Sequence, residues 1–322
     1  MGRFRASLIA LLVLPGLYLA AWPVPVDPVA WQAPEDKGLS GAFAENRALS
    51  GARPVPLDNH EGPEDVAAGQ DGALYATTHS GTILRIHPET GEVVDFASVS
   101  GRPLGIEAAA DGSLIVATPS SGLQRISPLG EVTLVLGDID GKPLVYANDL
   151  AVSVDGVIYF SEASAKFGAD AWGGTYEASL LDILEHGGHG RIIAFDPRTD
   201  EVRVLVDGLN FANGVAISAD ERFLLIAETG SYRILRYWLQ GPEAGTTEVV
   251  LDNLPGFPDN INTGAAGRFW VGLVAPRDSK VDALSDQPFL RKVVQRLPAF
   301  LRPAAAPSSH VVAINGDGKV LS

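Results

Sequence analysis

The stretch Gly208–Gly272 reads GLNFANGVAISADERFLLIAETGSYRILRYWLQGPEAGTTEVVLDNLPGFPDNINTGAAGRFWVG and contains one phrase twice. In each copy, an Asn or an Asp-Asn pair follows an aromatic residue, Phe211 or Phe257. Two short apolar runs come next, separated by a polar turn. Two apolar runs around a polar turn predict a β-hairpin. Each hairpin would therefore begin just after a side chain that carries an oxygen atom.

Related phrases recur along the chain and set its period. Their turns lie 40, 44, 65 and 47 residues apart, at Asp71, Asp111, Asp155, Asp220 and Gly267. A period of about 40–50 residues with four strands per unit is typical of a β-propeller blade. The one long spacing requires an insertion, which Lys166–Gly190 supplies. A β-sandwich is the alternative, but its turns recur about every 8–12 residues without the longer period.

Composition agrees with a large all-β domain. The chain has 322 residues, of which 46% are hydrophobic, so it can bury a sizeable core. A formal net charge of −15 argues against nucleic acid or anionic lipid as the main partner, because either would repel the protein. The absence of cysteine excludes disulfides, thiol catalysis and Cys-ligated zinc.

Residues 1–22 predict a membrane anchor. Arg3 and Arg5 precede the uncharged apolar run Ala6–Trp22, which has the length of a short membrane span or a long signal-peptide core. Leu19 fits poorly at the −3 position of a cleavage site, which favours an uncleaved anchor over a cleaved signal. Because the positive charge precedes the run, we expect a single-pass protein whose propeller lies on the periplasmic, extracellular or lumenal side.

The remaining chain divides into a linker and one domain. Residues 23–41 are rich in proline and predict an extended linker, and residues 42–322 form the propeller. We expect five complete blades, with Ala42–Leu57 contributing to a partial sixth, and a chain that is truncated at its C-terminus. Within the insertion, Glu177–Glu185 predicts a helix in a candidate lid, and Val281–Leu297 predicts a second helix.

Several longer motifs resemble the strictosidine synthase-like family: GRPLGI (101–106), GLNFANGV (208–215), AET (227–229), RILRYWL (233–239) and PGFPDNI (255–261). That family has a six-bladed β-propeller fold, which paraoxonases and gluconolactonases share. Those relatives hold a calcium ion at the top of the central tunnel and hydrolyse lactones and esters. The resemblance implies an all-β, six-bladed β-propeller with an incomplete last blade in this chain, preceded by the N-terminal anchor helix.

The resemblance also implies which residues bind calcium. The catalytic calcium ligands would be Glu64, Asn148, Asn213, Asp259 and Asn260, and a second, structural calcium would use Asp65 and Asp149. Carboxylate and amide oxygens are hard ligands that suit Ca²⁺. The five catalytic ligands come from four blades, each at the start of a predicted first strand, so the ring would bring them together. Any one of them alone reads equally well as a turn former or strand cap.

Two departures from the relatives concern the acid/base groups. The histidine pair of paraoxonases is replaced by Leu104 and by residues near Thr118. The catalytic glutamate of strictosidine synthase belongs to the sixth blade, which this chain does not supply. His79 and Glu162 lie at the ends of second strands and are the candidate catalytic residues; histidine titrates near neutral pH. An ordinary exposed loop histidine is the alternative for His79.

The sequence therefore predicts a calcium-dependent hydrolase whose substrate is a small ester or lactone. Two other functions stay open. One is a non-catalytic, membrane-anchored calcium-propeller binding protein. The other is a strictosidine synthase-type condensation of an amine with an aldehyde.

Overall fold

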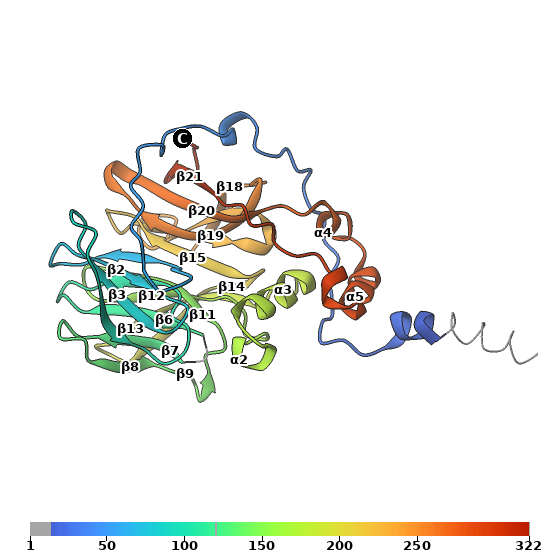
Figure 1. Cartoon of the computed structure of the whole chain (residues 1–322), viewed down its shortest axis with the longest axis horizontal. Coiled ribbons are helices and arrows are strands. Elements are labelled where there is room, and N and C mark those ends of the chain that lie inside the picture. The colour runs from blue at the N-terminus through green and yellow to red at the C-terminus, as the bar shows by residue number, and fades with distance from the viewer. Residues whose placement is uncertain (1–13, 120, 322) are drawn as a thin grey trace, which may run out of the picture.

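The computed structural model describes residues 14–119 and 121–321, and this part of the chain forms five antiparallel sheets of three or four strands in sequence order, together with one two-stranded hairpin. In each sheet, consecutive strands pair with one another, as in a propeller blade. Figure 1 shows the five sheets fanned one after another, with the first near β2 and the last at β21. The structure thus confirms the all-β, propeller-like architecture.

Four of the sheets have four strands. The first contains β1 Val66–Ala68, β2 Leu74–Thr77, β3 Thr82–Ile86 and β4 Val93–Ser98, and the second contains β5 Ile106–Ala108, β6 Leu114–Thr118, β7 Gly122–Ile126 and β8 Val132–Leu136. The third contains β11 Ala147–Val152, β12 Ile158–Glu162, β13 Gly190–Asp196 and β14 Glu201–Leu209. The fourth contains β15 Ala212–Ile217, β16 Phe223–Glu228, β17 Arg233–Trp238 and β18 Thr247–Leu251. A small hairpin, β9 Asp138–Ile139 with β10 Lys142–Pro143, joins the second sheet to the third.

The fifth sheet has three strands, β19 Gly256–Thr263, β20 Arg268–Pro276 and β21 His310–Asn315. The prediction of five complete blades is therefore wrong for this sheet. After β21 the chain turns, with the Gly318 amide bonded to the Asn315 carbonyl, and returns beside β21 through a single bridge between Ile314 and Val320. One bridge does not make a fourth strand within the described residues.

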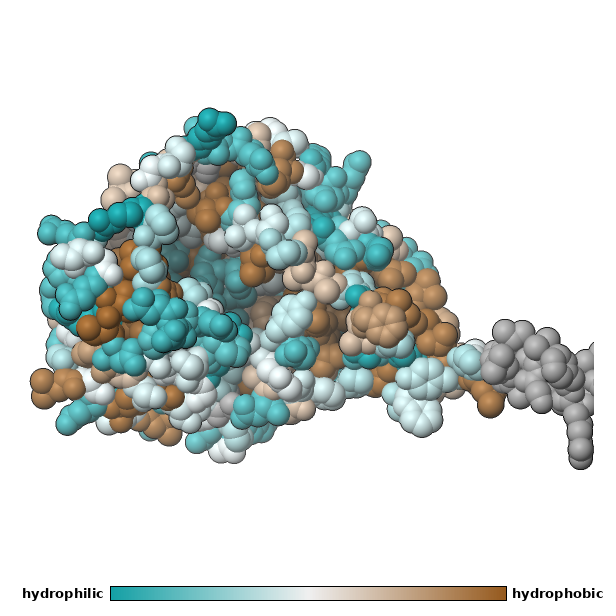
Figure 2. Space-filling view, in the orientation of Figure 1, coloured by the Kyte–Doolittle hydropathy of each residue, from teal (hydrophilic) through white to brown (hydrophobic). Residues whose placement is uncertain are grey.

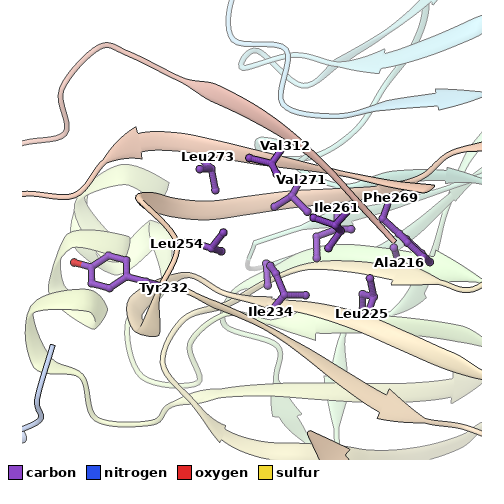
Figure 3. Close-up of a cluster of buried hydrophobic side chains, with 12 residues drawn as sticks. Ala216, Leu225, Tyr232, Ile234, Leu254, Ile261, Phe269, Val271, Leu273 and Val312 are labelled. Carbon is purple, nitrogen blue, oxygen red and sulfur yellow. The ribbon is translucent and has the colours of Figure 1, made fainter. Parts of the chain in front are cut away.

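Each pair of neighbouring sheets encloses its own apolar core. The innermost strands β1, β5, β11, β15 and β19 contact one another in that order around the centre. Between the fourth and fifth sheets, Leu225 and Ile234 face Ile261, Phe269 and Val271, all buried (Figure 3). Burying such side chains contributes about 1.5–3 kcal/mol each, so these interfaces stabilise the stack of sheets.

The segment Ala42–Leu57 forms no strand but lies between the last and first sheets. Its 3-10 turn η1 (Gly41–Phe43) places Phe43 against the core of the fourth and fifth sheets. Further along, Val55 and Leu57 pack on the outer flank of the first sheet. Figure 1 shows this blue segment passing from the neighbourhood of the C-terminus down to β2. The segment therefore covers apolar surface on the fifth sheet and on the first sheet, but it does not complete a blade between them.

The two insertions are helical and lie at one side of the sheets (Figure 1). The first contains α2 Ala169–Trp172 and α3 Thr175–Glu185, which confirms the helix predicted at Glu177–Glu185. The second contains α4 Ser279–Ala283, α5 Pro288–Arg296 and the 3-10 turn η4 Ala299–Leu301. The single helix predicted at Val281–Leu297 is thus divided. Pro288 lacks an amide hydrogen and clashes with a preceding turn, so it begins a helix and cannot continue one.

The proline-rich segment is extended, as expected, but it is not a free spacer. Val29 donates its amide hydrogen to the Glu185 carbonyl, 2.9 Å away, and Trp31 donates to the Ser285 carbonyl at 3.1 Å. The Trp31 ring stacks on His186, with 4.1 Å between the ring centres. We call residues 23–36 the strap, because these contacts fasten it across both insertions.

The predicted anchor lies mostly outside the described residues. Residues 14–21 are helical, and Arg3 and Arg5 precede the described part of the chain. Among the helices that the structure describes, none has the length and apolarity needed to span a bilayer.

Candidate calcium site at the centre of the propeller

Three of the strands that carry the predicted ligands have a β-bulge where those ligands lie. The pairing of β11 with β12 shifts between Ala147 and Leu150, and that of β15 with β16 shifts between Ala212 and Val215. The pairing of β19 with β20 shifts between Pro258 and Ile261. These intervals contain Asn148-Asp149, Asn213 and Asp259-Asn260. A bulge redirects a side chain locally and is common beside functional sites, so the bulges account for polar side chains inside otherwise apolar strands.

Hydrogen bonds join the predicted catalytic ligands across the centre. Asn213 donates its Nδ2 hydrogen to Asp259 Oδ1 at 2.5 Å, which links the fourth and fifth sheets. Asn260 donates its Nδ2 hydrogen to the Glu64 carbonyl at 2.9 Å, which links the fifth sheet to the first. Asn148 is 3% exposed, at the start of the third sheet. The structure thus brings Glu64, Asn213, Asp259 and Asn260 together.

Three oxygen atoms of this group are buried without a hydrogen-bond partner: Glu64 Oε2, Asn213 Oδ1 and Asn260 Oδ1. A buried acceptor without a partner costs about 1–3 kcal/mol, and native proteins rarely leave one. Three such atoms on neighbouring side chains form a set of free oxygen ligands. This is the donor chemistry that a calcium ion prefers.

The electrostatics of the group are also unfavourable without a cation. Burial raises the pKa of Glu64 well above its ordinary range, and the charges of Asp259, Asp65 and Asp149 raise it further. Burial raises the pKa of Asp259 to about 6, against the opposing effects of the Asn213 hydrogen bond and the Arg102 charge. A bound divalent cation would stabilise both ionised carboxylates.

The second predicted site has different surroundings. Asp65 accepts hydrogen bonds from the Ile106 amide at 3.0 Å and from Asn262 Nδ2 at 3.1 Å. Asp149 accepts from the amides of Leu150 and Val215, both at 2.8 Å. These bonds connect Asp65 to the second and fifth sheets and Asp149 to the fourth. The two carboxylates therefore already join sheets to one another, and all four of their oxygens have a partner.

Burial raises the pKa of Asp65, and the pKa of Asp149 lies well above its ordinary range because of burial and of the nearby Asp65 charge. The effect of the Asp65 charge on Asp149 is compatible with a shared cation. In the described residues, however, no three His, Cys, Asp or Glu side chains are arranged to hold a metal ion. The catalytic set depends instead on amide oxygens, and Asp65 and Asp149 form only a pair.

The first insertion covers this region. Ala178 and Leu181 of α3 pack in one buried cluster with Leu104, Tyr146 and Phe211. Tyr146 donates its hydroxyl hydrogen to the Thr175 carbonyl at 2.9 Å, and Arg102 donates to the Thr175 hydroxyl. Leu104 is therefore an apolar contact of the candidate lid.

Arg102 is a functional candidate that the sequence analysis missed. Its Nε is buried without a hydrogen-bond partner, and its positive charge lowers the pKa values of Asp259 and Tyr146. The guanidinium therefore lies near the predicted calcium ligands and beneath α3. A sequence signal existed, because Arg102 belongs to the GRPLGI motif that precedes the second sheet.

The two predicted acid/base residues differ in their surroundings. His79 is exposed, its amide donates to the Glu61 carbonyl at 2.9 Å, and its Cβ lies against Gly62. This places it at the rim beside the Glu64 segment. Glu162 is fully buried, and its carboxylate accepts from the Val145 amide at 2.8 Å and from Arg191 at 2.6 Å.

The Glu162–Arg191 pair joins β12 to β13, and Glu228 forms the same pair with Arg233 between β16 and β17 at 2.6 Å. The structure corrects the assignment of Glu162 as a catalytic group, because both of its oxygens are occupied by structural hydrogen bonds. Glu228 braces the fourth sheet in the same way.

Comparison with known proteins identifies the family. The sequence profile described as "Strictosidine synthase" matches residues 148–242, and "Strictosidine synthase-like, N-terminal" matches residues 41–86. Over 320 residues, the chain is 35% identical to the adipocyte plasma membrane-associated protein of Bos taurus, covering 91% of this chain and 75% of that protein. The chain belongs to the strictosidine synthase-like family.

Solved structures outside the family share its fold. A gluconolactonase from Xanthomonas campestris superimposes with a TM-score of 0.59 at 18% identity, covering 81% of this chain and 76% of that one. Regucalcin, a calcium-binding protein from Agrobacterium tumefaciens, superimposes with a TM-score of 0.53 at 15% identity, covering 82% and 72%. At these identities the likeness concerns the fold alone.

Proposed function

We propose that this protein is a calcium-dependent hydrolase of esters or lactones. The observation that carries the proposal is the group of buried, unpartnered oxygens Glu64 Oε2, Asn213 Oδ1 and Asn260 Oδ1 beside Asp259. Two fold neighbours support it, since one is described as a gluconolactonase and the other as a calcium-binding protein. Glu64, Asn148, Asn213, Asp259 and Asn260 would hold the catalytic calcium, and Asp65 and Asp149 would hold a structural one.

A calcium ion bound there supplies Lewis-acid polarisation of a substrate carbonyl. The protein's own groups would complete the site. Arg102 places a positive charge close to Asp259. When water attacks the substrate, negative charge would develop on the carbonyl oxygen, and the Arg102 charge would stabilise it. Tyr146 is held in place by its bond to Thr175, and burial raises its pKa, so it remains a neutral hydrogen-bond group beneath the lid. His79, at the rim, remains the candidate general base.

The competing function, a non-catalytic calcium-propeller binding protein, is favoured by one observation. Both oxygens of Glu162 are engaged in structural bonds, and His79 is exposed, so no buried acid/base group is committed to catalysis among the candidates. The condensation of an amine with an aldehyde has no comparable observation in its favour.

The test uses the full chain, stripped with a chelator and reloaded with Ca²⁺. Calorimetry should detect calcium binding, and a panel of lactones and aryl esters should be hydrolysed only by the loaded protein. An Asn213→Ala variant should lose both. Calcium binding without hydrolysis of any substrate would favour the binding protein. Binding that survives both Asn213→Ala and Asp259→Ala would contradict the site itself.

We also propose that the propeller ring has six blade positions and that Ala42–Leu57 lies in the sixth. This segment packs on both the last and the first sheets. The membrane location is a further part of the proposal. It is supported by Arg3 and Arg5 before the apolar run and by a relative described as plasma membrane-associated. Protease protection in intact cells tests the orientation: the propeller should be digested from the non-cytoplasmic side.

A further inference from the structure

The second insertion carries exposed apolar side chains that the propeller does not use. Phe289 and Leu290 at the start of α5 are 57% and 42% exposed, and Phe300 and Leu301 of η4 are 84% and 57% exposed. Tyr18 and Trp22, on the last helical turns before the strap, are 43% and 60% exposed. We call these six residues the interfacial patch. Figure 2 shows hydrophobic surface over the α5 region, next to the place where the N-terminal residues leave the domain.

Hydrogen bonds hold the two parts of the patch together. Arg296 of α5 donates from Nε to the Trp22 carbonyl at 2.6 Å and from Nη1 to the Leu19 carbonyl at 2.9 Å. Arg291 is 2% exposed and donates to the carbonyls of Val29 and Leu184. Hydrogen bonds therefore connect the end of the N-terminal helix, the strap and α5 to one another.

Several basic side chains lie beside the patch, but most of them are already engaged. Residues 288–316 contain no Asp or Glu and carry Arg291, Lys292, Arg296 and Arg302. Arg291 and Arg296 are buried and donate to backbone carbonyls, and Lys292 pairs with Asp27 at 2.7 Å. The character of the patch therefore comes from its apolar and aromatic side chains.

We propose that the interfacial patch binds the surface of a lipid bilayer, so that α5 and η4 rest in the headgroup region in addition to any anchorage by the N-terminal run. Two features specify a bilayer. The patch continues the apolar run Ala6–Trp22, and it presents Tyr18, Trp22, Phe289 and Phe300, the aromatic side chains that favour membrane interfaces.

The chain contains no cysteine, so single-cysteine variants can report where each side chain lies. Phe289→Cys and Phe300→Cys test the patch. Leu129→Cys and Val154→Cys are matched controls, because these residues are 87% and 83% exposed in turns at the other ends of the strands. Each full-length variant is labelled with an environment-sensitive dye. It is then reconstituted into vesicles of phosphatidylcholine and phosphatidylglycerol.

We expect the labels at positions 289 and 300 to show blue-shifted emission, quenching by a lipid-borne nitroxide and protection from aqueous iodide. The reason is that the apolar face of an interfacial segment is buried roughly 5–10 Å into the boundary between headgroups and acyl chains. The control labels should show the reverse. If the Phe300 label is quenched by iodide like the Leu129 label, the propeller hangs away from the bilayer and the proposal is wrong. Protection that depends on protein concentration, without nitroxide quenching, would assign the patch to self-association and equally overturn it.

Discussion

Replacing Asp259 with asparagine should stabilise the metal-free protein and weaken its response to calcium. The substitution keeps the size of the side chain and an oxygen that can accept from Asn213, but it removes one charge from a buried group that also contains Glu64. The two effects have opposite signs. A residue kept only for packing would not show both of them.

The size of the first effect follows from the environment of Asp259. Burial raises its pKa to about 6, from an ordinary value of 3.8. Each pKa unit corresponds to about 1.4 kcal/mol, so the ionised carboxylate destabilises the metal-free fold by about 3 kcal/mol at neutral pH. Because the folded-state pKa is raised, this loss of stability develops as the pH rises from about 4 to 6. It should be absent from the Asp259→Asn variant.

The assay is denaturant unfolding in chelator and in excess calcium. A ligand at 100 times its Kd stabilises a protein by about 2.7 kcal/mol, so the wild type should gain on this order from calcium and the variant much less. Asp200→Asn is the matched control: it is the same chemical change at an exposed turn whose left-handed backbone asparagine tolerates. An Asp259→Asn protein that is less stable than wild type in chelator, or that keeps the full calcium response, would refute this reasoning.

Three further predictions concern neighbouring groups. Glu162→Gln should cost about 3 kcal/mol of stability by breaking the buried pair with Arg191, yet leave the pH–rate profile unchanged; a shifted profile would restore Glu162 as a catalytic candidate. Arg102→Gln should lower kcat/KM about 100-fold with calcium affinity, measured by calorimetry, preserved. Burial lowers the pKa of His186 to about 3, so acid should destabilise the fold by about 1.4 kcal/mol per pH unit below 6.5, where only the unfolded chain takes up the proton. The difference in unfolding free energy between wild type and His186→Asn should show this slope between pH 6 and pH 5, because Asp259 titrates in both proteins and its contribution cancels.

Much of the fold was accessible from the sequence because its signals are local and repeated. The turns at Asp71, Asp111, Asp155 and Asp220 each open a four-stranded sheet, and the 65-residue spacing contains the helical insertion. The oxygen-bearing pairs were visible for the same reason, since Asn148-Asp149 interrupts an apolar run. Local signals failed at the fifth sheet, where the described residues after the turn at Asn315 form a single bridge in place of a fourth strand.

What the sequence concealed depends on contacts between distant residues. The strap reads as a spacer, yet Arg291 reaches it across 262 positions and the Trp31 ring stacks on His186. Glu162 has the sequence position of a catalytic acid at the end of a second strand. Only the neighbouring Arg191 and the Val145 amide show that it braces the sheet. The GRPLGI motif marked the segment that contains Arg102, but the effect of the Arg102 charge on the pKa of Asp259 arises between residues far apart in the sequence.

The topology places the candidate calcium site and the interfacial patch at the same end of the strands. First strands begin there, and the insertions after β12 and β20 follow second strands, which return to that end. A lipophilic substrate in the bilayer would therefore enter on the side where the site lies. If both proposals hold, the KM for long-chain esters should be lower when the esters are presented in vesicles than when they are dissolved in dilute, detergent-free solution. Phe300→Ser should raise the KM for the vesicle-borne esters while leaving a water-soluble lactone unaffected, and an equal effect on both substrates would separate the patch from substrate delivery.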